Sequence, residues 1–220
     1  MTDAPPLTTP KDSPAQAARQ VARAGTARLP AAERRRQLLQ VALETFAAKG
    51  FHHTSMNEVA DNAGVTKPVL YQHFKSKQAL YRELVDELGA QLEQEVFEAV
   101  SNATGPRQQV EEGFRAYFRW ATCQGPAFRV LFSERNRADP ALAEAVDRVE
   151  AVVADRVAEL IDIEGLSESE RQVLAFGVVG IAESTSRRWL GLGLGAGTDA
   201  EAFANQVAGL AWSGLRGISP

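Results

Sequence analysis

Apolar residues recur along most of the chain at the spacing of an amphipathic helix. The first such segment has five apolar residues three or four positions apart: Leu39, Ala42, Leu43, Phe46 and Ala47. This spacing places them on one face of a helix, and Gly50 follows where a helix-ending glycine is expected. No segment alternates apolar and polar residues over the length of a half-buried strand. From Pro30 onward the pattern therefore predicts an all-α fold.

Two short helices joined by a tight turn are expected within residues 55–74. Ser55 has the spacing of a capping box to the acidic residue three positions on, which predicts the start of the first helix, and Gly64 ends it. Thr66 is placed to cap the second helix, and Pro68 is tolerated in its first turn because the amide there has no intrahelical partner. Two such helices describe a helix-turn-helix, whose second helix enters a DNA major groove about 12 Å wide.

Longer helices are expected beyond this motif. Ser76 is placed to cap a fourth helix that runs to about Ala103, and Gly-Pro and Asp-Pro pairs then separate further amphipathic segments. The glycine-rich stretch at residues 191–197 is predicted to be a flexible loop before a last helix at about residues 199–214.

The charge is distributed unevenly along the 220 residues, whose formal net charge is −4. Residues 1–82 carry 12 basic and 6 acidic side chains, and residues 83–220 carry 12 basic and 22 acidic ones. The basic first part predicts a module that meets a polyanion. Within it, residues 1–30 are rich in Pro, Thr and Ala without hydrophobic periodicity, so we expect a disordered basic tail. Whether this tail contacts DNA or is only a solvated leader stays open.

The residues of the predicted helix-turn-helix resemble those of a known family. The stretch from about Glu33 to Leu92 resembles the DNA-binding domain of TetR/AcrR-family transcriptional regulators, above all in the run GVTKPVLYQHFKSK at residues 64–77. The resemblance implies a helix-turn-helix DNA-binding domain over residues 31–92. It also implies a helical effector-binding and dimerisation domain over residues 93–220.

A narrower resemblance joins the chain to the actinobacterial regulators of fatty-acid synthase expression. It rests on KPVLYQHF at residues 67–74, FRVLF at residues 128–132, WL at residues 189–190 and AWSGL at residues 211–215. It implies control of lipid metabolism, with a long-chain acyl-CoA as the effector. A TetR-type repressor responding to a drug-like or other hydrophobic ligand is the alternative. The operator, the target genes and the direction of control, repression or activation, do not follow from the sequence.

The family resemblance also implies which side chains contact DNA. Tyr71 would contact a phosphate through its hydroxyl, and Thr54 and Thr66 would do so at two helix starts, helped by backbone amides. Gln72 and Lys67 would face base edges. Glutamine can pair with adenine through two hydrogen bonds. Each of these is alternatively a solvated surface residue. With the flanking arginines and lysines that are placed to reach phosphates, the predicted set is Arg35, Arg36, Thr54, Ser55, Thr66, Lys67, Pro68, Tyr71, Gln72, His73, Lys75 and Lys77.

The acidic second part contains an aromatic-rich segment that is a candidate for a ligand cavity. Such cavities are mostly hydrophobic with few polar groups, so we expect a lipid chain, such as that of an acyl-CoA, to bind here. Arg129 or Arg188 is a candidate for meeting its thioester or phosphate head. The alternative for each aromatic residue is ordinary core packing. The predicted lining is Val96, Val100, Phe114, Tyr117, Phe118, Phe128 and Phe132.

Small residues recur on one stripe of the helix expected at about residues 167–190, and apolar residues recur in the last helix. Together they resemble the family's four-helix dimer interface: Gly177, Gly180, Ala182, Ser186, Phe203, Val207, Leu210 and Trp212. A two-fold dimer suits DNA binding, because its recognition helices reach successive major grooves about 34 Å apart on a pseudo-palindrome. Glu183, within the stripe, is expected either to pair with an arginine across the interface or to face solvent.

Several function classes are disfavoured by what the sequence lacks. His52, His53 and His73 form no pair spaced for a metal, and Cys123 is a single cysteine without a neighbouring ligand, so neither a metal site nor a disulfide is expected. The chain has no nucleophile elbow, phosphate loop or dinucleotide fingerprint, which argues against an enzyme and against a cofactor. The longest largely apolar run, residues 173–182, is shorter than the roughly 20 residues of a membrane span. We expect a homodimer in the cytoplasm. A nonspecific DNA-compacting protein is a further alternative, and the acidic second part speaks against it.

The expected mechanism is a population shift. An effector in the cavity moves the fourth helix, which links both domains, and thereby changes the separation of the two recognition helices. The effector regulates only when it binds one separation better than the other.

Overall fold

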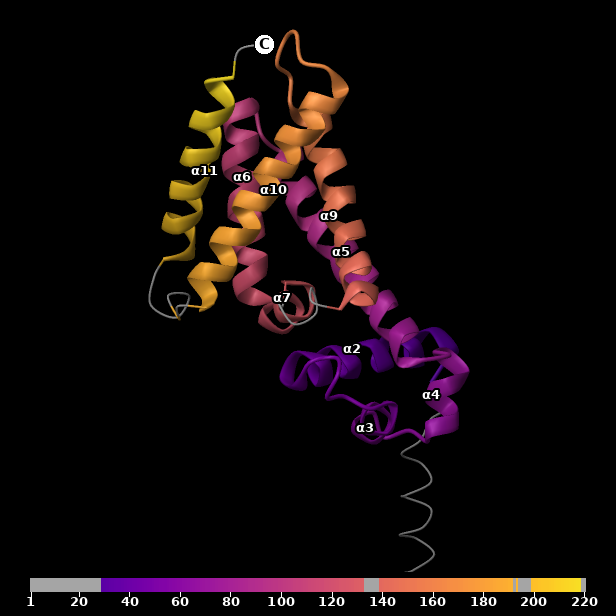
Figure 1. Ribbon diagram of the computed structural model, residues 1–220. Helices are drawn as coiled ribbons and strands as arrows, with labels where there is room; N and C mark the ends of the chain where they lie inside the picture. Colours follow the sequence, from indigo (N-terminus) through magenta and orange to yellow (C-terminus); the bar gives the residue numbers. More distant parts are fainter. Residues whose placement is uncertain (1–28, 133–138, 192, 194–198, 219–220) are drawn as a thin grey trace, which may run out of the picture. The chain divides into compact units, whose positions relative to one another are not determined.

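The computed structural model describes residues 29–132, 139–191, 193 and 199–218. These described residues form helices and connecting loops without a β-strand, which confirms the all-α prediction. The expected N-terminal tail and the expected glycine-rich loop fall largely outside them. The helices are α2 (Ala31–Lys49), α3 (Met56–Asn62), α4 (Lys67–His73), α5 (Lys77–Ser101), α6 (Pro106–Cys123), α7 (Gly125–Phe132), α9 (Pro140–Leu160), α10 (Glu168–Gly191) and α11 (Ala200–Arg216) (Figure 1).

The chain divides into two compact units, residues 1–37 and residues 38–220. In the first unit α2 begins, and the Arg34 guanidinium donates a hydrogen bond to Gln37 Oε1 at 2.6 Å. The second unit holds the rest of α2 and all later helices.

Local signals in the sequence set several helix starts and stops. Ser55 and Ser76 cap α3 and α5 as predicted, because their side-chain oxygens accept hydrogen bonds from the backbone amides three residues on, at 3.2 and 3.1 Å. Gly50 and Gly64 follow α2 and α3 with φ angles of +80° and +65°, which glycine adopts without strain.

Two other local signals act differently from the prediction. Thr66 is the N-cap residue of α4, but its side chain makes no capping hydrogen bond. One of the two amides that an N-cap side chain can reach belongs here to Pro68, which has no N–H. Glu58, the second half of the expected capping box, pairs instead with the Lys49 ammonium. That ion pair ties α3 to the end of α2, a contact that local spacing does not reveal.

One hydrophobic core extends from the helix-turn-helix into the later helices. Phe46, Phe51 and Tyr81 pack ring against ring, with centroids 5.1 to 5.8 Å apart. Buried side chains of α7, among them Val130 and Leu131, belong to the same core. The Tyr81 hydroxyl donates a buried hydrogen bond to the Val130 carbonyl oxygen at 3.0 Å. Burial raises the pKa of Tyr81 above its usual range, so this hydroxyl keeps its proton.

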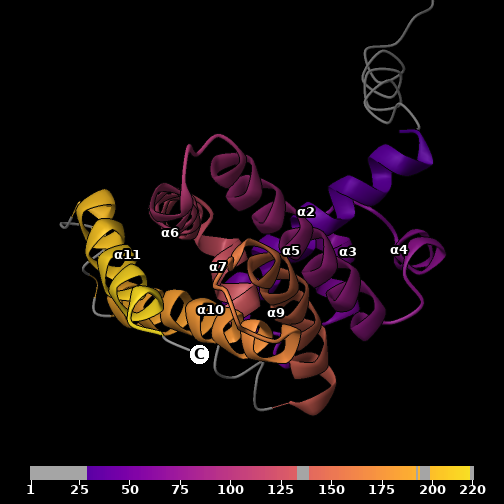
Figure 2. The ribbon, with the colours of Figure 1, turned by 90° about the horizontal axis from the view of Figure 1, so that it is seen from above.

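Helices α5, α6, α9, α10 and α11 form a closed ring. Contacts run from α6 to α5, then to α9, α10 and α11, and back to α6, and Figure 2 shows the same order from above. Gly89 lets α5 approach α9 closely, because a Cβ atom there would lie 2.5 Å from a methyl carbon of Val149. The rings of Trp189 and Phe203 stack with centroids 5.4 Å apart, which joins α10 to α11.

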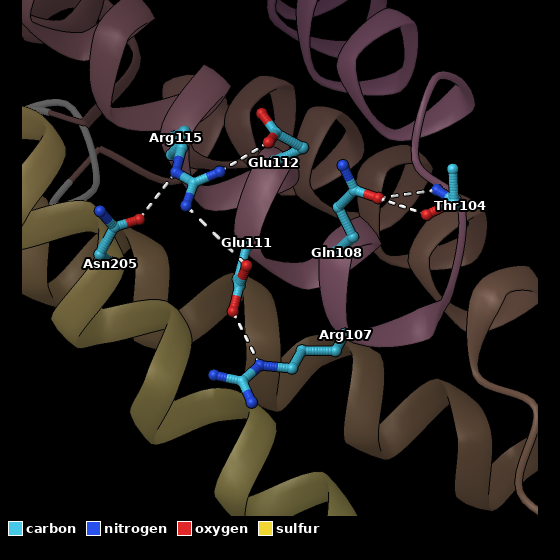
Figure 3. Close-up of polar contacts among 7 residues, drawn as sticks. All are labelled: Thr104, Arg107, Gln108, Glu111, Glu112, Arg115 and Asn205. Carbon is cyan, nitrogen blue, oxygen red and sulfur yellow. Dashed lines mark hydrogen bonds and ion pairs between the residues drawn. The ribbon is translucent and has the colours of Figure 1, made fainter.

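Polar contacts also connect α6 with α11 (Figure 3). The Arg115 guanidinium donates to Asn205 Oδ1 of α11 at 2.7 Å and to Glu112 Oε1 of its own helix at 2.6 Å. Glu111 lies near the same guanidinium and accepts a hydrogen bond from Arg107 at 2.8 Å. Exposed ion pairs contribute only about 0.2–1 kcal/mol each, so buried apolar packing is the main force that holds the ring.

We expect Tyr81→Phe to lower the free energy of unfolding by about 1 kcal/mol, because it removes one buried hydrogen bond and keeps the ring. Urea unfolding followed by circular dichroism measures the loss. Tyr71→Phe is the matched control, because Tyr71 is 42% exposed and its hydroxyl is not buried in the core. Equal unfolding curves for both variants would show that the Tyr81 hydroxyl contributes nothing to stability.

Candidate nucleic-acid interface and internal cavity

Helix α4 presents one face to solvent. Leu70 is fully buried and anchors the helix in the core. The Lys67 ammonium lies 5.8 Å from the centre of the Tyr71 ring, so a cation and a phenol share the outer surface. Cations, hydroxyls and amides are the groups that contact phosphates and base edges. The exposed residues at this surface are those predicted, Thr66, Lys67, Pro68, Tyr71 and Gln72.

Thr54 and Lys77 are bonded within the protein. Thr54 is 2% exposed, and its hydroxyl donates to the Gly50 carbonyl oxygen at 2.9 Å. The Lys77 ammonium donates to the carbonyl oxygens of Phe51 and Thr54, both at 2.8 Å, and lies 4.3 Å from the centre of the Phe51 ring. Burial lowers the pKa of Lys77 from its ordinary value. The DNA contacts predicted for both residues therefore require these internal bonds to be shared or broken.

The remaining predicted DNA contacts lie in different surroundings. Lys75 is exposed directly after α4, and His73 is half-buried in its last turn. Ser55 is exposed, and its hydroxyl oxygen is used in capping α3. Arg36 is exposed and Arg35 half-buried in the unit of residues 1–37.

A cavity of about 430 Å³ lies inside the ring of helices, with walls from α5, α6, α7, α9, α10 and α11. This volume is within the range of pockets that hold small molecules. The predicted residues Val96, Val100, Phe114, Tyr117 and Phe132 are part of its wall.

Phe118 and Phe128 lie outside the cavity wall. Phe118 is fully buried and packs edge-on against Trp189 and Phe203, with centroids 5.8 and 5.4 Å away. Phe128 packs against Phe132, with centroids 4.9 Å apart, in the core shared with the helix-turn-helix. The sequence shows that both are apolar, but it does not show which side of the ring each one faces.

Sequence reasoning missed the walls that α9 and α11 contribute. The residues concerned are Val149, Val153, Val157, Leu160, Trp212 and Leu215. Their helical spacing in the sequence is the same as that of ordinary core residues, so periodicity alone gives no signal for a cavity.

Three of the polar residues in the mostly apolar wall are Tyr117, Glu150 and Glu183. The hydroxyls of Tyr117 and Ser186 are 3.1 Å apart. Burial raises the pKa of Tyr117 above its usual range, and the nearby carboxylates of Glu183 and Glu150 act in the same direction. Glu183 is 7% exposed and pairs with Arg187 of its own helix at 3.3 Å. The expectation that Glu183 faces solvent is therefore wrong.

The residues suggested for a ligand head group lie elsewhere. Arg129 and Arg188 are both exposed, and neither is part of the cavity wall. The Arg129 guanidinium instead donates to the Ala47 carbonyl oxygen at 3.4 Å.

Large apolar side chains are exposed on α10 and α11. Val173 is 70% exposed, Phe176 48% and Leu210 64%. Of the predicted interface stripe, Gly177 is exposed, whereas Val207 is buried in the core formed by α6, α10 and α11.

In the described part of the chain, no group of three or more His, Cys, Asp or Glu side chains is arranged to hold a metal ion. Among the same residues, no helix combines the length and the apolar character needed to cross a membrane.

The sequence of this chain is similar to those of known proteins. Residues 38–84, which contain the helix-turn-helix, match the family described as bacterial regulatory proteins, tetR family. The chain is 36% identical over 164 residues to the HTH-type transcriptional activator FasR of Mycolicibacterium smegmatis, and the match covers 74% of this chain and 75% of that protein.

Solved structures share the fold. A TetR-like transcriptional regulator from Rhodococcus sp. RHA1 matches with a TM-score of 0.70 at 27% identity, over 87% of this chain and 100% of that one. The regulator FadR from Bacillus subtilis, in complex with stearoyl-CoA, matches with a TM-score of 0.71 at 18% identity, over 83% of this chain and 98% of that one.

These relatives are transcriptional regulators and not enzymes, which agrees with the prediction that this chain is not an enzyme. The family match covers most of α2, all of α3 and α4, and the start of α5, and so includes the exposed surface around Tyr71 on α4. The match to FasR extends the similarity over three quarters of that protein. The chain belongs to the TetR family of helix-turn-helix transcriptional regulators.

Proposed function

We propose that this protein is a homodimeric regulator whose binding to a pseudo-palindromic operator is controlled by a long-chain acyl-CoA held in its cavity. The observation that carries the proposal is the apolar cavity inside the ring, because one of its wall residues, Phe132 of α7, belongs to the core that α7 shares with the helix-turn-helix. One structural neighbour supports the choice of effector, because FadR from Bacillus subtilis was solved in complex with stearoyl-CoA.

The exposed face of α4 is the proposed DNA-reading surface. Gln72 is exposed, and glutamine reads adenine through two hydrogen bonds in the major groove. Tyr71, one position earlier, is the proposed phosphate contact. Lys77 and Thr54 have a positioning role in this proposal, because their bonds hold the chain between α2 and α3 against the start of α5.

The outer sides of α10 and α11 are the proposed dimer face. These two helices pack against each other and expose Val173, Phe176 and Leu210. Large exposed apolar patches mark interaction sites, and Gly177, which is also exposed, lets a second backbone approach.

The cavity has the length and chemistry of a chain-binding site. Its α9 wall runs from Val149 to Leu160, about 16 Å at 1.5 Å per residue. Burial of each methylene group contributes about 0.8 kcal/mol, which corresponds to about fourfold in affinity. Affinity therefore rises with chain length until the cavity is full.

The route from cavity to DNA runs through α7. Phe132 is part of the cavity wall, and Val130, two residues earlier, accepts the hydrogen bond from Tyr81. Tyr81 packs on Phe46 and Phe51 of the helix-turn-helix core. A ligand that prefers one position of α7 therefore shifts the helix-turn-helix by its difference in affinity for the two states.

For DNA binding, we expect Tyr71→Phe to weaken binding to every sequence by about tenfold or more, since a hydrogen bond to a charged group is lost. Gln72→Ala should instead relax base preference at one position of each half-site. Fluorescence anisotropy measures both, on an operator selected by the protein from a random duplex library and on its single-base variants. Gln94→Ala, an exposed glutamine in the second half of α5, is the control. Full base preference in Gln72→Ala would refute the assignment of Gln72.

For the cavity, we expect Val153→Phe to lower the affinity for stearoyl-CoA more than that for shorter acyl-CoAs, because the larger ring takes up cavity space. Val152→Phe is the matched control, since Val152 is 48% exposed on the same helix and lies outside the wall. Calorimetry with a ladder of saturated acyl-CoAs measures the effect. Binding of apolar cations, but of no acyl-CoA, would favour a drug-responsive regulator instead.

For the dimer, we expect Leu210→Glu to produce monomers and to lower operator affinity by about a hundredfold or more, because the two half-sites are no longer bound together. Analytical ultracentrifugation and anisotropy measure the two effects. Val152→Glu places the same charge on exposed α9 and should change neither. A Leu210→Glu protein that stays dimeric would rule out the outer side of α11 as the interface.

A further inference from the structure

A second hollow of about 480 Å³ adjoins the cavity at the C-terminal end of α11. Its residues come from the first turn of α6 and the last turns of α11: Arg107, Gly209, Trp212, Ser213, Arg216 and Gly217. Trp212 and Arg216 also belong to the cavity wall, so the two hollows are direct neighbours. We call it the arginine groove.

The ionisable side chains of the arginine groove are both cations. In the described part of the chain, Arg216 makes no hydrogen bond or ion pair. Arg107 pairs with Glu111 at 2.8 Å, but its side chain is 71% exposed. Such an exposed pair contributes only about 0.3–0.5 kcal/mol, so a phosphate can compete for this guanidinium. Arginine presents a fork of donors that matches phosphate oxygens.

The helix dipole makes the position of Arg107 unfavourable for a cation. It lies in the first turn of α6, where the positive end of the helix dipole disfavours a cation. Arg216 lies in the last turn of α11, where the negative end of the helix dipole favours a cation. A ligand that brings negative charge between them removes the cost at Arg107.

The groove also has room for a bulky group. A Cβ atom added at Gly209 would meet nothing within 4 Å, so this part of the groove is open. Trp212 forms part of both hollows and offers an apolar surface between them.

The cavity wall has the opposite charge. It includes four carboxylates and, besides Arg216, no other cation: Glu93, Glu150, Asp162 and Glu183. Moving an anion from water into an apolar cavity is costly, and neighbouring carboxylates increase the cost. An amphiphilic anion therefore gains most by placing its chain in the cavity and its charge in the arginine groove.

We infer that the arginine groove binds the phosphate-bearing head of the acyl thioester whose chain fills the cavity. This inference rests on the proposed function. It fixes the orientation of the ligand, with the head at Arg107 and Arg216 and the end of the chain toward Phe132.

The test compares two thioesters of the same chain on the full-length protein. Palmitoyl-CoA carries phosphates, and the palmitoyl thioester of N-acetylcysteamine carries none. We expect Arg107→Gln/Arg216→Gln to lower the affinity for palmitoyl-CoA by about tenfold or more and to leave the affinity for the phosphate-free thioester unchanged. Arg119→Gln is the matched control, because Arg119 is exposed on α6 and belongs to neither hollow.

Three outcomes would overturn the inference. Equal affinity of the wild-type protein for both thioesters would show that no head-group site exists, and the proposed function would stand. An equal loss of both affinities in the double variant would show that the arginines only support the fold. Binding of neither thioester to the wild-type protein would overturn the inference together with the proposed acyl-CoA effector.

Discussion

A buried hydrogen bond, from the Tyr81 hydroxyl to the carbonyl oxygen of Val130, fixes α5 of the helix-turn-helix core to α7, which contributes to the cavity wall. It lies in a core that runs without interruption from the helix-turn-helix through α5 and α7 to α9. Close-packed protein interiors transmit strain from one element to the next. Lys77 lies one helical turn before Tyr81 and holds the carbonyls of Phe51 and Thr54. In the proposed mechanism, a movement of α7 would therefore be passed to α5 and on to the chain that leads into α3.

The cavity follows from the same packing. A ring in which each helix touches the next leaves an interior that side chains must fill, and here they leave about 430 Å³ open. An unfilled apolar space costs stability, because its lining lacks packing partners. A chain that fills it stabilises whichever state has the better-fitting wall. Under the proposed function, the cavity would make stability depend on the ligand, and the shared core would make DNA binding depend on it too.

Local features of this fold were predictable from the sequence, and long-range ones were not. The caps at Ser55 and Ser76 and the break at Gly64 depend on residues a few positions apart. The family resemblance implies DNA contacts for Thr54 and Lys77, and their positions near helix starts do not show whether the side chains face solvent or the core. Their internal bonds depend on contacts between elements distant in sequence. The arginine groove was missed for the same reason, since Arg107 and Arg216 meet only through the packing of α6 on α11.

The positions of the charges in residues 83–220 matter as well as their sum. Its net negative charge disfavours nonspecific contact with DNA, and four of its carboxylates line the cavity. In the proposed orientation these acids keep the charged head of an amphiphile out, and the two arginines receive it at one end. The uncharged chain then extends toward Phe132, the wall residue that belongs to α7 and the shared core. The ligand's apolar end, which varies most among lipids, would therefore be the end that acts on the contact between Tyr81 and Val130.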